Sequence, residues 1–321
     1  TTRNEGNGVT MNEAKPGTDA PPEHDDALGE RSVLLGLSYR LLGSLADAED
    51  AAQETYARWY RLSEEQRRLV SSPRAWLITT ASRIGLDMLT TARARRERYA
   101  GPWLPDPVAG TERWSSQDTS AGVDPAERAA LDDSVSMALM VVLESMTPAE
   151  RVAFVLHDVF SYTFPEIAEI VGRTPAACRQ LASSGRSRVR AARRNPVDPA
   201  EHSAVVRSFK TAWETGDLAA LVGLLDPDAI AITDGGGLVS AALEPLHGAS
   251  AVAGFLLGVY ERQPDLVIRE EQVNGELGLV AFGGGRVLAI VGVAQAGGRV
   301  ERVWAMRNPD KLQAWNLRLE T

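Results

Sequence analysis

The residues most able to do chemistry are arginines that gather just past the middle of the chain. The segment 173–194 carries seven arginines and no acid, although the 321-residue chain has a formal net charge of −9. An acidic protein gains little from bulk attraction to a polyanion, so a basic helix within it predicts a specific phosphate-bearing target. Nucleic acid is the leading candidate, and a solvated arginine face on an ordinary helical bundle is the alternative interpretation.

The sequence around these arginines predicts a helix-turn-helix. A capping box at Thr163 predicts a short helix from about Pro165, and Gly172 stands where a helix commonly ends. Thr174, followed by a proline, predicts the start of a second helix. One face of that helix is apolar and is expected to pack inward: Cys178, Leu181, Ala182, Gly185 and Val189.

The second helix of such a motif places its first turns in the major groove of DNA. Six residues there could reach base edges: Arg173, Thr174, Ala176, Arg179, Gln180 and Ser183. Arg186, Arg190 and Arg193 recur further along the same face and could contact phosphates.

Length and composition place this motif within a larger protein. A chain of 34.6 kDa predicts two or three domains, and the lone Cys178 excludes an internal disulfide framework. No stretch is long and apolar enough to cross a bilayer, which predicts a cytoplasmic protein. Residues 1–26 are polar and predict a disordered tail, within which Met11 could be the true start. The residue pattern suggests no metal site and no cofactor.

Two helical blocks and a linker follow the tail. Residues 27–99 are helical in pattern: a first helix ends at Gly43, a second covers 46–62, and a third starts at Pro73 after a polar loop at 63–72. Residues 100–124, rich in Gly, Pro, Ser and Trp, predict a linker. Residues 125–197 form the second helical block, which contains the helix-turn-helix.

The last block, 198–321, has a different character. Helical patterns around Phe209 and over 219–225 and 251–260 accompany strand-like runs at 229–233, 266–273, 277–282, 287–294 and 300–306. Asn274-Gly275 is a hairpin signal. Helices followed by an antiparallel meander predict an α+β domain with a curved sheet around helices. The whole chain is therefore predicted to be multidomain, with two all-α domains before an α+β domain.

This order of parts resembles bacterial extracytoplasmic-function sigma factors, the compact kind that holds only sigma regions 2 and 4. Asp47-Ala-Glu-Asp-Ala-Ala-Gln-Glu-Thr resembles region 2.2, Pro73-Arg-Ala-Trp-Leu the start of region 2.3, and Phe164-Pro-Glu-Ile-Ala-Glu-Ile-Val-Gly-Arg region 4.2. The last block is similar to SnoaL-like members of the NTF2-like superfamily, whose fold is a cone. The combination indicates the sigma-J-like subgroup.

Three short signatures strengthen the resemblance. They are Trp103, Leu104, Pro105, Asp106 and Pro107 in the linker; Asp234, Gly235, Gly236 and Gly237 in the last block; and Asn308, Pro309, Asp310, Lys311 and Leu312 near the end. The chain departs from the subgroup at two positions. Asp106 stands where the subgroup more often has Glu, and Leu238 stands where a basic residue usually follows the glycines.

The resemblance implies two further surfaces. Region 2.2 would bind the clamp of RNA polymerase, which assigns five residues to that contact: Asp47, Asp50, Gln53, Glu54 and Arg58. Region 2.3 would capture the unpaired minus-ten bases through Trp76, Arg83 and Asp87 and hold the strand backbone through Arg93, Arg95 and Arg96. A solvated acidic helix start is the alternative for the first set, and a core role is the favoured alternative for Trp76.

The last block is expected to be regulatory. The resemblance implies that it packs against the linker and sigma regions through the three signatures, so that release is a shift between packed and open states. A catalytic role for Asp234, His202 or His247 is the alternative, but an acid beside three glycines more often belongs to a turn. A small-molecule ligand in this block is a further possibility.

The resulting hypothesis is a sigma factor that binds core RNA polymerase and directs promoter-specific initiation, without enzymatic activity of its own. Two other functions stay open at this point. A stand-alone helix-turn-helix regulator would bind duplex DNA tightly without polymerase, and an isomerase-type enzyme tethered to DNA would turn over a small hydrophobic molecule.

Overall fold

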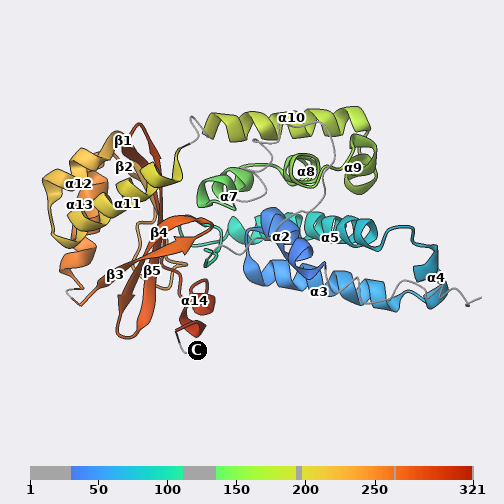
Figure 1. The fold of residues 1–321 in the computed structure, drawn as a ribbon, viewed down its shortest axis with the longest axis horizontal. Coiled ribbons are helices and arrows are strands. Elements are labelled where there is room, and N and C mark those ends of the chain that lie inside the picture. Colours follow the sequence, from blue (N-terminus) through green and yellow to red (C-terminus); the bar gives the residue numbers. More distant parts are fainter. Residues whose placement is uncertain (1–29, 111–134, 193–196, 264, 320–321) are drawn as a thin grey trace, which may run out of the picture.

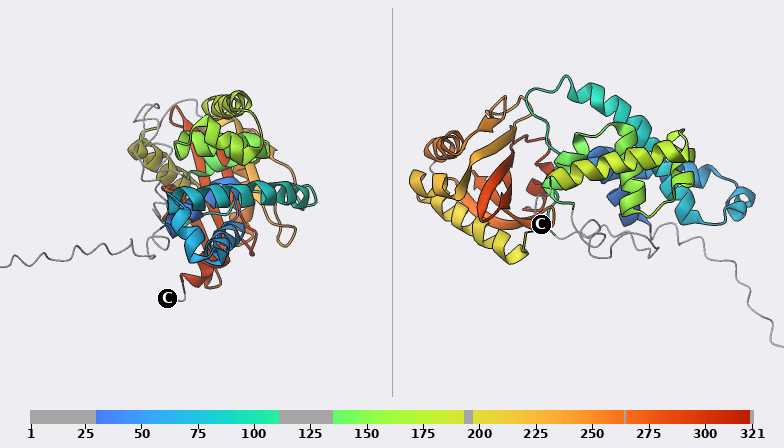
Figure 2. Two further views of the ribbon diagram at one scale, coloured as in Figure 1. Left: turned by 90° about the vertical axis from the view of Figure 1, so that its right-hand side faces the viewer. Right: turned by 90° about the horizontal axis from the view of Figure 1, so that it is seen from above.

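The computed structural model describes residues 30–110, 135–192, 197–263 and 265–319, apart from the side chains at 93 and 94. The expected disordered tail, the boundary at residue 124 and Arg193 lie outside this range. Within it, two helical units precede a sheet domain (Figure 1). Figure 2 shows the sheet domain at one end of an elongated molecule.

The first helical unit contains α2 (Arg31–Leu42), α3 (Leu45–Arg61), α4 (Glu64–Leu69) and α5 (Pro73–Arg96). Gly43 ends α2 in the left-handed conformation, with φ of 68°, as its position in the sequence predicted. The expected polar loop at 63–72 instead contains α4. This short helix forms because Ser63 and Gln66 make a capping box.

The second helical unit contains α7 (Met137–Glu144), α8 (Pro148–Phe154), the short π-helix η1 (Val155–Val159), α9 (Phe164–Val171) and α10 (Pro175–Ala192). Capping boxes form at Thr147 and at Thr163, and the sequence predicted the one at Thr163. The π-helix had no signal in the sequence.

The two helical units share one hydrophobic core. Leu37 of α2 and Leu77 of α5 belong to the same buried cluster as Phe154 and Leu156 of the second unit. Helix α5 packs against α8 and α9, while α10 lies on the outer side of the second unit (Figure 1). The two units are therefore held together by apolar burial.

The tail domain, residues 198–319, is built around a six-stranded sheet. Its strands are β1 (Leu225–Asp234), β2 (Leu246–His247), β3 (Val267–Val273), β4 (Glu276–Gly283), β5 (Arg286–Ala296) and β6 (Arg299–Met306), in the order β2-β1-β6-β5-β4-β3. Its helices are α11 (Pro199–Glu214), α12 (Leu218–Leu224), α13 (Ala249–Glu261) and α14 (Gln313–Leu317). The predicted α+β class is confirmed, and the meander β3 to β6 is antiparallel as expected. Outside the meander, β1 pairs with β6 in parallel, a pairing that the sequence did not predict.

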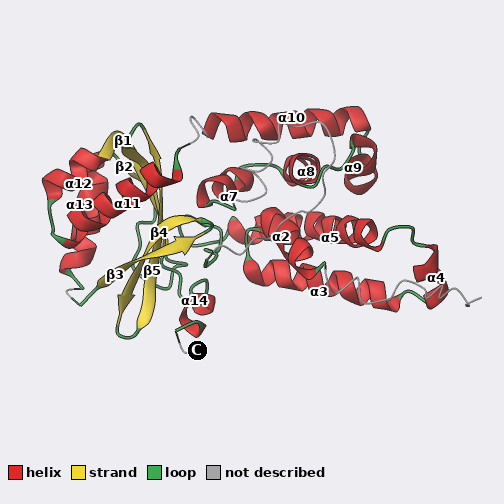
Figure 3. Cartoon of the chain, viewed as in Figure 1, coloured by secondary structure: helices red, strands yellow, loops and turns green. Residues whose placement is uncertain are grey.

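The two faces of this sheet have different partners (Figure 3). Alternation along β6 places Val303 with the helices α11, α12 and α13, and its neighbour Trp304 on the opposite face. That opposite face packs against Leu104 of the linker and Met137 of the second unit. This face of the sheet therefore connects the tail domain to the linker and the second helical unit. No helix within the described ranges is long and apolar enough to span a membrane.

Candidate nucleic-acid interface and interdomain junction

The helix-turn-helix forms as the sequence predicted. Thr163 donates its backbone N–H to Glu166 Oε2 at 2.7 Å, and Gly172 ends α9 with φ of 69°. Ala177 N donates to Thr174 Oγ1 at 3.2 Å, which caps α10. Gly185 packs directly against Phe154 at the end of α8, because a Cβ at this position would lie only 2.9 Å from the Phe154 Cβ.

The two faces of α10 separate as expected. Cys178, Ala182, Gly185 and Val189 are buried, and Leu181 is half-buried. Most residues expected to reach DNA are exposed on the outer side: Arg173, Thr174, Ala176, Arg179, Gln180, Ser183 and Arg190. The structure therefore presents a polar, arginine-bearing surface along this helix.

Arg186 and Arg179 both contact neighbouring side chains. Arg186 is half-buried, and its Nη1 donates to both carboxylate oxygens of Asp158 at 3.0 and 3.1 Å. The Arg179 guanidinium lies 5.2 Å from the ring centre of Phe164, within the range of a cation–π contact. The first contact limits how far Arg186 can reach, while the second orients Arg179.

The residues expected at the minus-ten strand are divided between surface and core. Trp76 is half-buried and packs 5.2 Å from the ring centre of Trp59, which fits the core alternative. Asp87 is exposed. Arg83 is exposed too, but its Nη2 donates to the carbonyl of Glu169 in α9 at 3.4 Å. The second unit therefore borders this part of α5.

The arginines at the end of α5 hold carboxylates. Arg95 Nη2 contacts both oxygens of Asp47, at 3.1 and 3.2 Å. Arg96, which was expected at the strand backbone, does not lie on an open surface. It binds Glu144 of α7 and the carbonyl of Leu42. Its guanidinium lies 3.7 Å from the ring centre of Trp103. The side chain of Arg93 is outside the described residues.

The residues expected to bind polymerase share one side of α3. Asp50, Gln53 and Arg58 are exposed, whereas Asp47 and Glu54 are half-buried. Glu54 accepts a 2.8 Å bond from Arg58 Nε, and this bond lowers the pKa of Glu54. The opposite side of α3 is buried in the core: Ala48, Ala51, Ala52, Thr55 and Trp59.

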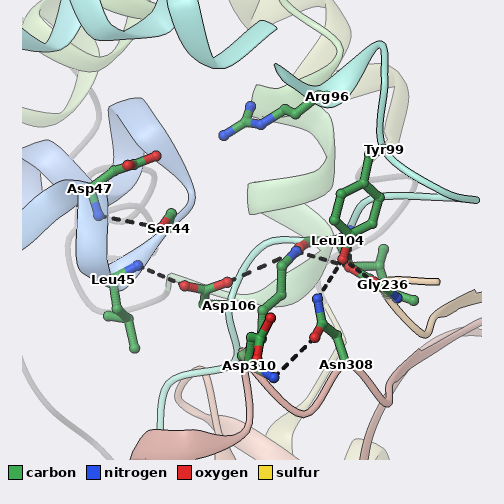
Figure 4. Close-up of polar contacts among 12 residues, drawn as sticks. Ser44, Leu45, Asp47, Arg96, Tyr99, Leu104, Asp106, Gly236, Asn308 and Asp310 are labelled. Atoms are coloured by element: carbon green, nitrogen blue, oxygen red, sulfur yellow. Dashed lines mark hydrogen bonds and ion pairs between the residues drawn. The ribbon is translucent and has the colours of Figure 1, made fainter. Parts of the chain in front are cut away.

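The three signatures meet at one junction, centred on the fully buried carboxylate of Asp234. Figure 4 shows Tyr99, Leu104, Gly236 and Asn308 gathered at this junction. Its Oδ1 accepts from the Tyr99 hydroxyl at 2.6 Å and from Gly236 N at 3.1 Å. Its Oδ2 accepts from Leu104 N and from Lys311 Nζ, each at 2.9 Å. The acid therefore bonds the end of the first unit, the linker and the last signature together, in addition to ordering its own turn.

The other signature residues complete this junction. Asn308 Nδ2 donates to the Tyr99 hydroxyl at 2.6 Å, and Gly236, with φ of +63°, passes so close that a Cβ would collide with the Asn308 side chain. Lys311 Nζ lies 4.0 Å from the ring centre of Trp103. Pro105 and Pro107 are buried, Gly235 has no space for a Cβ, and Leu312 joins the apolar cluster of Leu104. Gly237, Pro309 and Asp310 lie at the exposed edge.

Asp106 sits apart from Asp234 on the other side of Lys311. Its Oδ2 accepts from Leu45 N at 2.8 Å, whereas its buried Oδ1 has no hydrogen-bond partner among the described residues and lies 3.9 Å from Lys311 Nζ. Burial raises the pKa of Asp106 and lowers that of Lys311. The Asp106–Lys311 ion pair is longer than the 2.9 Å pair between Lys311 and Asp234.

A second junction was not expected from the sequence. Asn274, in the β3–β4 turn with φ of 53°, donates Nδ2 to the carbonyl of Val135 at 2.8 Å and to the Tyr39 hydroxyl at 3.1 Å. Its Oδ1 accepts from Val108 N at 3.1 Å. The turn therefore binds the first unit, the linker and the start of the second unit. Sequence reasoning found only its hairpin signal.

The tail domain also contains a small apolar cavity between α13 and the sheet. It holds about 20 Å³, room for about one water molecule, and its lining includes Trp213, Leu256 and Arg307. Asp234, His202 and His247, the candidate acids and bases, do not line it. His202 Nε2 instead lies 2.9 Å from the carbonyl of Leu277.

Comparison with known proteins identifies the family to which this chain belongs. A family model described as Sigma-70 region 2 matches residues 30–95, and one described as Sigma-70, region 4 matches residues 136–189. The chain belongs to the extracytoplasmic-function RNA polymerase sigma factors. It is 39% identical over 297 residues to the ECF RNA polymerase sigma factor SigJ of Mycobacterium tuberculosis, a match that covers 88% of this chain and 90% of that protein.

Two further comparisons agree with this assignment. The probable ECF sigma factor SigI of Mycobacterium tuberculosis is 33% identical over 285 residues, which cover 88% of this chain and 92% of that protein. The crystal structure of SigJ from Mycobacterium tuberculosis matches with a TM-score of 0.68 and 36% identity, over 89% of this chain and 97% of that one. The tail domain is thus part of the shared architecture.

Proposed function

We propose that this sigma factor recognises the minus-thirty-five element through α10 and the minus-ten strand through α5, while α3 binds core RNA polymerase and the tail domain controls access to these surfaces. The observation that carries the regulatory part is the core shared by the two helical units. The factor would act in the cytoplasm, where polymerase meets the chromosome.

The spacing of the promoter elements supports the proposal that the packed form is inactive. Elements named for positions −35 and −10 are about 25 base pairs apart, or about 85 Å of duplex at 3.4 Å per pair. Helices α5 and α10 belong to units packed on one core, with α9 in contact with Arg83. The packed form therefore cannot place both surfaces on their elements at once, and the second unit must separate from the first.

The tail domain stabilises the packed form through both junctions. Asp234 holds Tyr99 and Leu104, and Asn274 holds Tyr39 and Val135. If only the open form binds the promoter, apparent affinity falls by the fraction of molecules that are open. The domain then regulates by a population shift and needs no catalytic residue. The position of Asp234 in the junction, away from the cavity, supports this role over an enzymatic one.

In vitro transcription with core polymerase over a promoter library tests the proposal. We expect promoter-specific transcripts, and we expect Asp234→Asn to lower the factor concentration needed for half-maximal output. Asp228→Asn, an exposed position on the same strand, is the matched control and should behave as the parent. Tight specific binding to duplex DNA without polymerase would favour a stand-alone regulator. Unchanged output from a folded Asp234→Asn protein would refute the regulatory part.

A further inference from the structure

The carboxylate of Glu144, at the end of α7, lies between two arginines from different units. Its Oε1 accepts from Arg96 Nη1 of the first unit, and its Oε2 accepts from Arg151 Nη2 of its own unit at 2.6 Å. The residues are separated by 48 and 7 positions in the chain, so no local signal predicts the cluster.

The same two arginines bind the end of α2. Arg151 Nη1 donates to the carbonyl of Leu41 at 2.6 Å, and Arg96 Nη2 donates to that of Leu42. The last carbonyls of a helix lack partners within the helix and carry the negative end of its dipole, so cations are stabilised there. Arg151 thereby anchors the second unit on the first, and Glu144 of the second unit holds Arg96.

Burial makes this cluster different from a surface ion pair. The side chain of Arg151 is 2% exposed, that of Arg96 13% and that of Glu144 24%. Burial lowers the pKa of Arg151, whereas Glu144 raises it. The Trp103 ring covers one side of the Arg96 guanidinium. A single carboxylate balances two guanidinium groups, so the cluster keeps one excess positive charge.

This arrangement is the one a phosphate group would make. Glu144 gives one oxygen to each arginine, as a phosphodiester gives its two non-bridging oxygens to guanidinium donors. We propose that Glu144 acts as an internal substitute for a promoter phosphate, which holds Arg96 in the packed form until the second unit moves away and Arg96 binds the strand backbone instead. The inference rests on the proposed assignment of the α5 arginines to the minus-ten strand.

Binding of single-stranded DNA to the full chain, without polymerase, tests this exchange. The probe is a labelled mixed-sequence oligonucleotide of about 20 nucleotides, because backbone contacts do not depend on sequence. Glu144→Gln keeps the shape and removes the charge. We expect it to bind the probe about tenfold more tightly than the parent at low salt, equal to about 1.4 kcal/mol.

A double-mutant cycle distinguishes exchange from a general change in charge. Arg96→Gln alone should change the affinity little, because Arg96 is already occupied, whereas Arg96→Gln combined with Glu144→Gln should lose most of the gain. Glu214→Gln, which breaks a half-buried pair with Lys210 in the tail domain, is the matched control and should leave the affinity unchanged. A gain that survives in the double variant would overturn the proposal, as would no gain at all.

Melting curves establish that each variant is folded. If Glu144→Gln is not, Glu144→Asp decides the question: it keeps the charge but is too short to hold both arginines, and it should give a smaller gain. Failure of the wider proposal would appear as absence of transcripts with core polymerase. Failure of this inference would appear as unchanged oligonucleotide affinity, which is measured without polymerase.

Discussion

Replacing Asn274 with glycine isolates the contribution of the second junction. Asn274 has φ of 53° and is followed by Gly275 at φ of 80°, so a glycine at 274 keeps the turn without strain. Only the side-chain contacts to Val135, Tyr39 and Val108 are lost.

The three hydrogen bonds of the Asn274 side chain determine how much stability the packed form loses. A neutral hydrogen bond contributes about 1 kcal/mol net, and buried partners left unsatisfied add to the loss. Asn274 is 3% exposed, so water replaces these bonds poorly in the packed form. The packed form should lose about 3 kcal/mol relative to the open form, which is about a 150-fold shift in their equilibrium.

Hydrogen exchange followed by mass spectrometry measures this shift directly. The Val108 amide donates to Asn274 in the parent, so peptides that contain it should exchange faster in Asn274→Gly. Peptides from the β4 and β5 core should exchange at the parent rate, because the tail domain itself stays folded. Unchanged exchange at Val108 would refute the argument that this side chain holds the packed form.

Three other expectations follow from the same geometry. Gly236→Ala should open the first junction and lower the factor concentration needed for transcription, whereas Gly284→Ala, at a similar φ of +59° but with open space around it, should not; equal effects would contradict a role for close packing. Burial raises the pKa of Asp106, so the ionised carboxylate destabilises the packed form at a pH above that pKa. The packed form should therefore become more stable as the pH falls through the pKa of Asp106. Asp106→Asn should abolish this pH dependence in a fluorescence-monitored titration. Arg179→Ala should cost about 1–3 kcal/mol and relax base preference in promoter binding by holoenzyme, whereas Arg190→Ala should weaken all sequences alike; identical specificity profiles would remove Arg179 from base reading.

Local signals explain what the sequence predicted well. The capping box at Thr163 and the left-handed Gly172 depend on residues a few positions apart, and the helix-turn-helix follows from them. The same kind of signal at Ser63 starts α4, although the polar composition of 63–72 favours a loop. The signature residues are brought together around Asp234, although their roles stay predictions.

The parts that sequence reasoning missed depend on distant residues. Asn274 and Tyr39 are 235 positions apart, and the contact between Arg96 and Glu144 requires two units to pack. The resemblance to region 2.3 implies a strand-backbone contact for Arg96, and a basic run gives no indication of which of its arginines meets an acid. The parallel pairing of β1 with β6 has the same cause, since it depends on how the chain returns across the sheet.

The distance between α5 and α10 shows whether the second unit leaves the first when the factor binds a promoter. Spin labels at Thr90→Cys and Ser187→Cys occupy exposed positions on the two helices, and the native Cys178 is buried. Pulsed electron paramagnetic resonance should give one short distance in the free factor and a distance longer by tens of ångströms in the promoter-bound holoenzyme, set by the separation of about 85 Å between the elements. The same short distance in both states would show that the two units stay packed on the promoter.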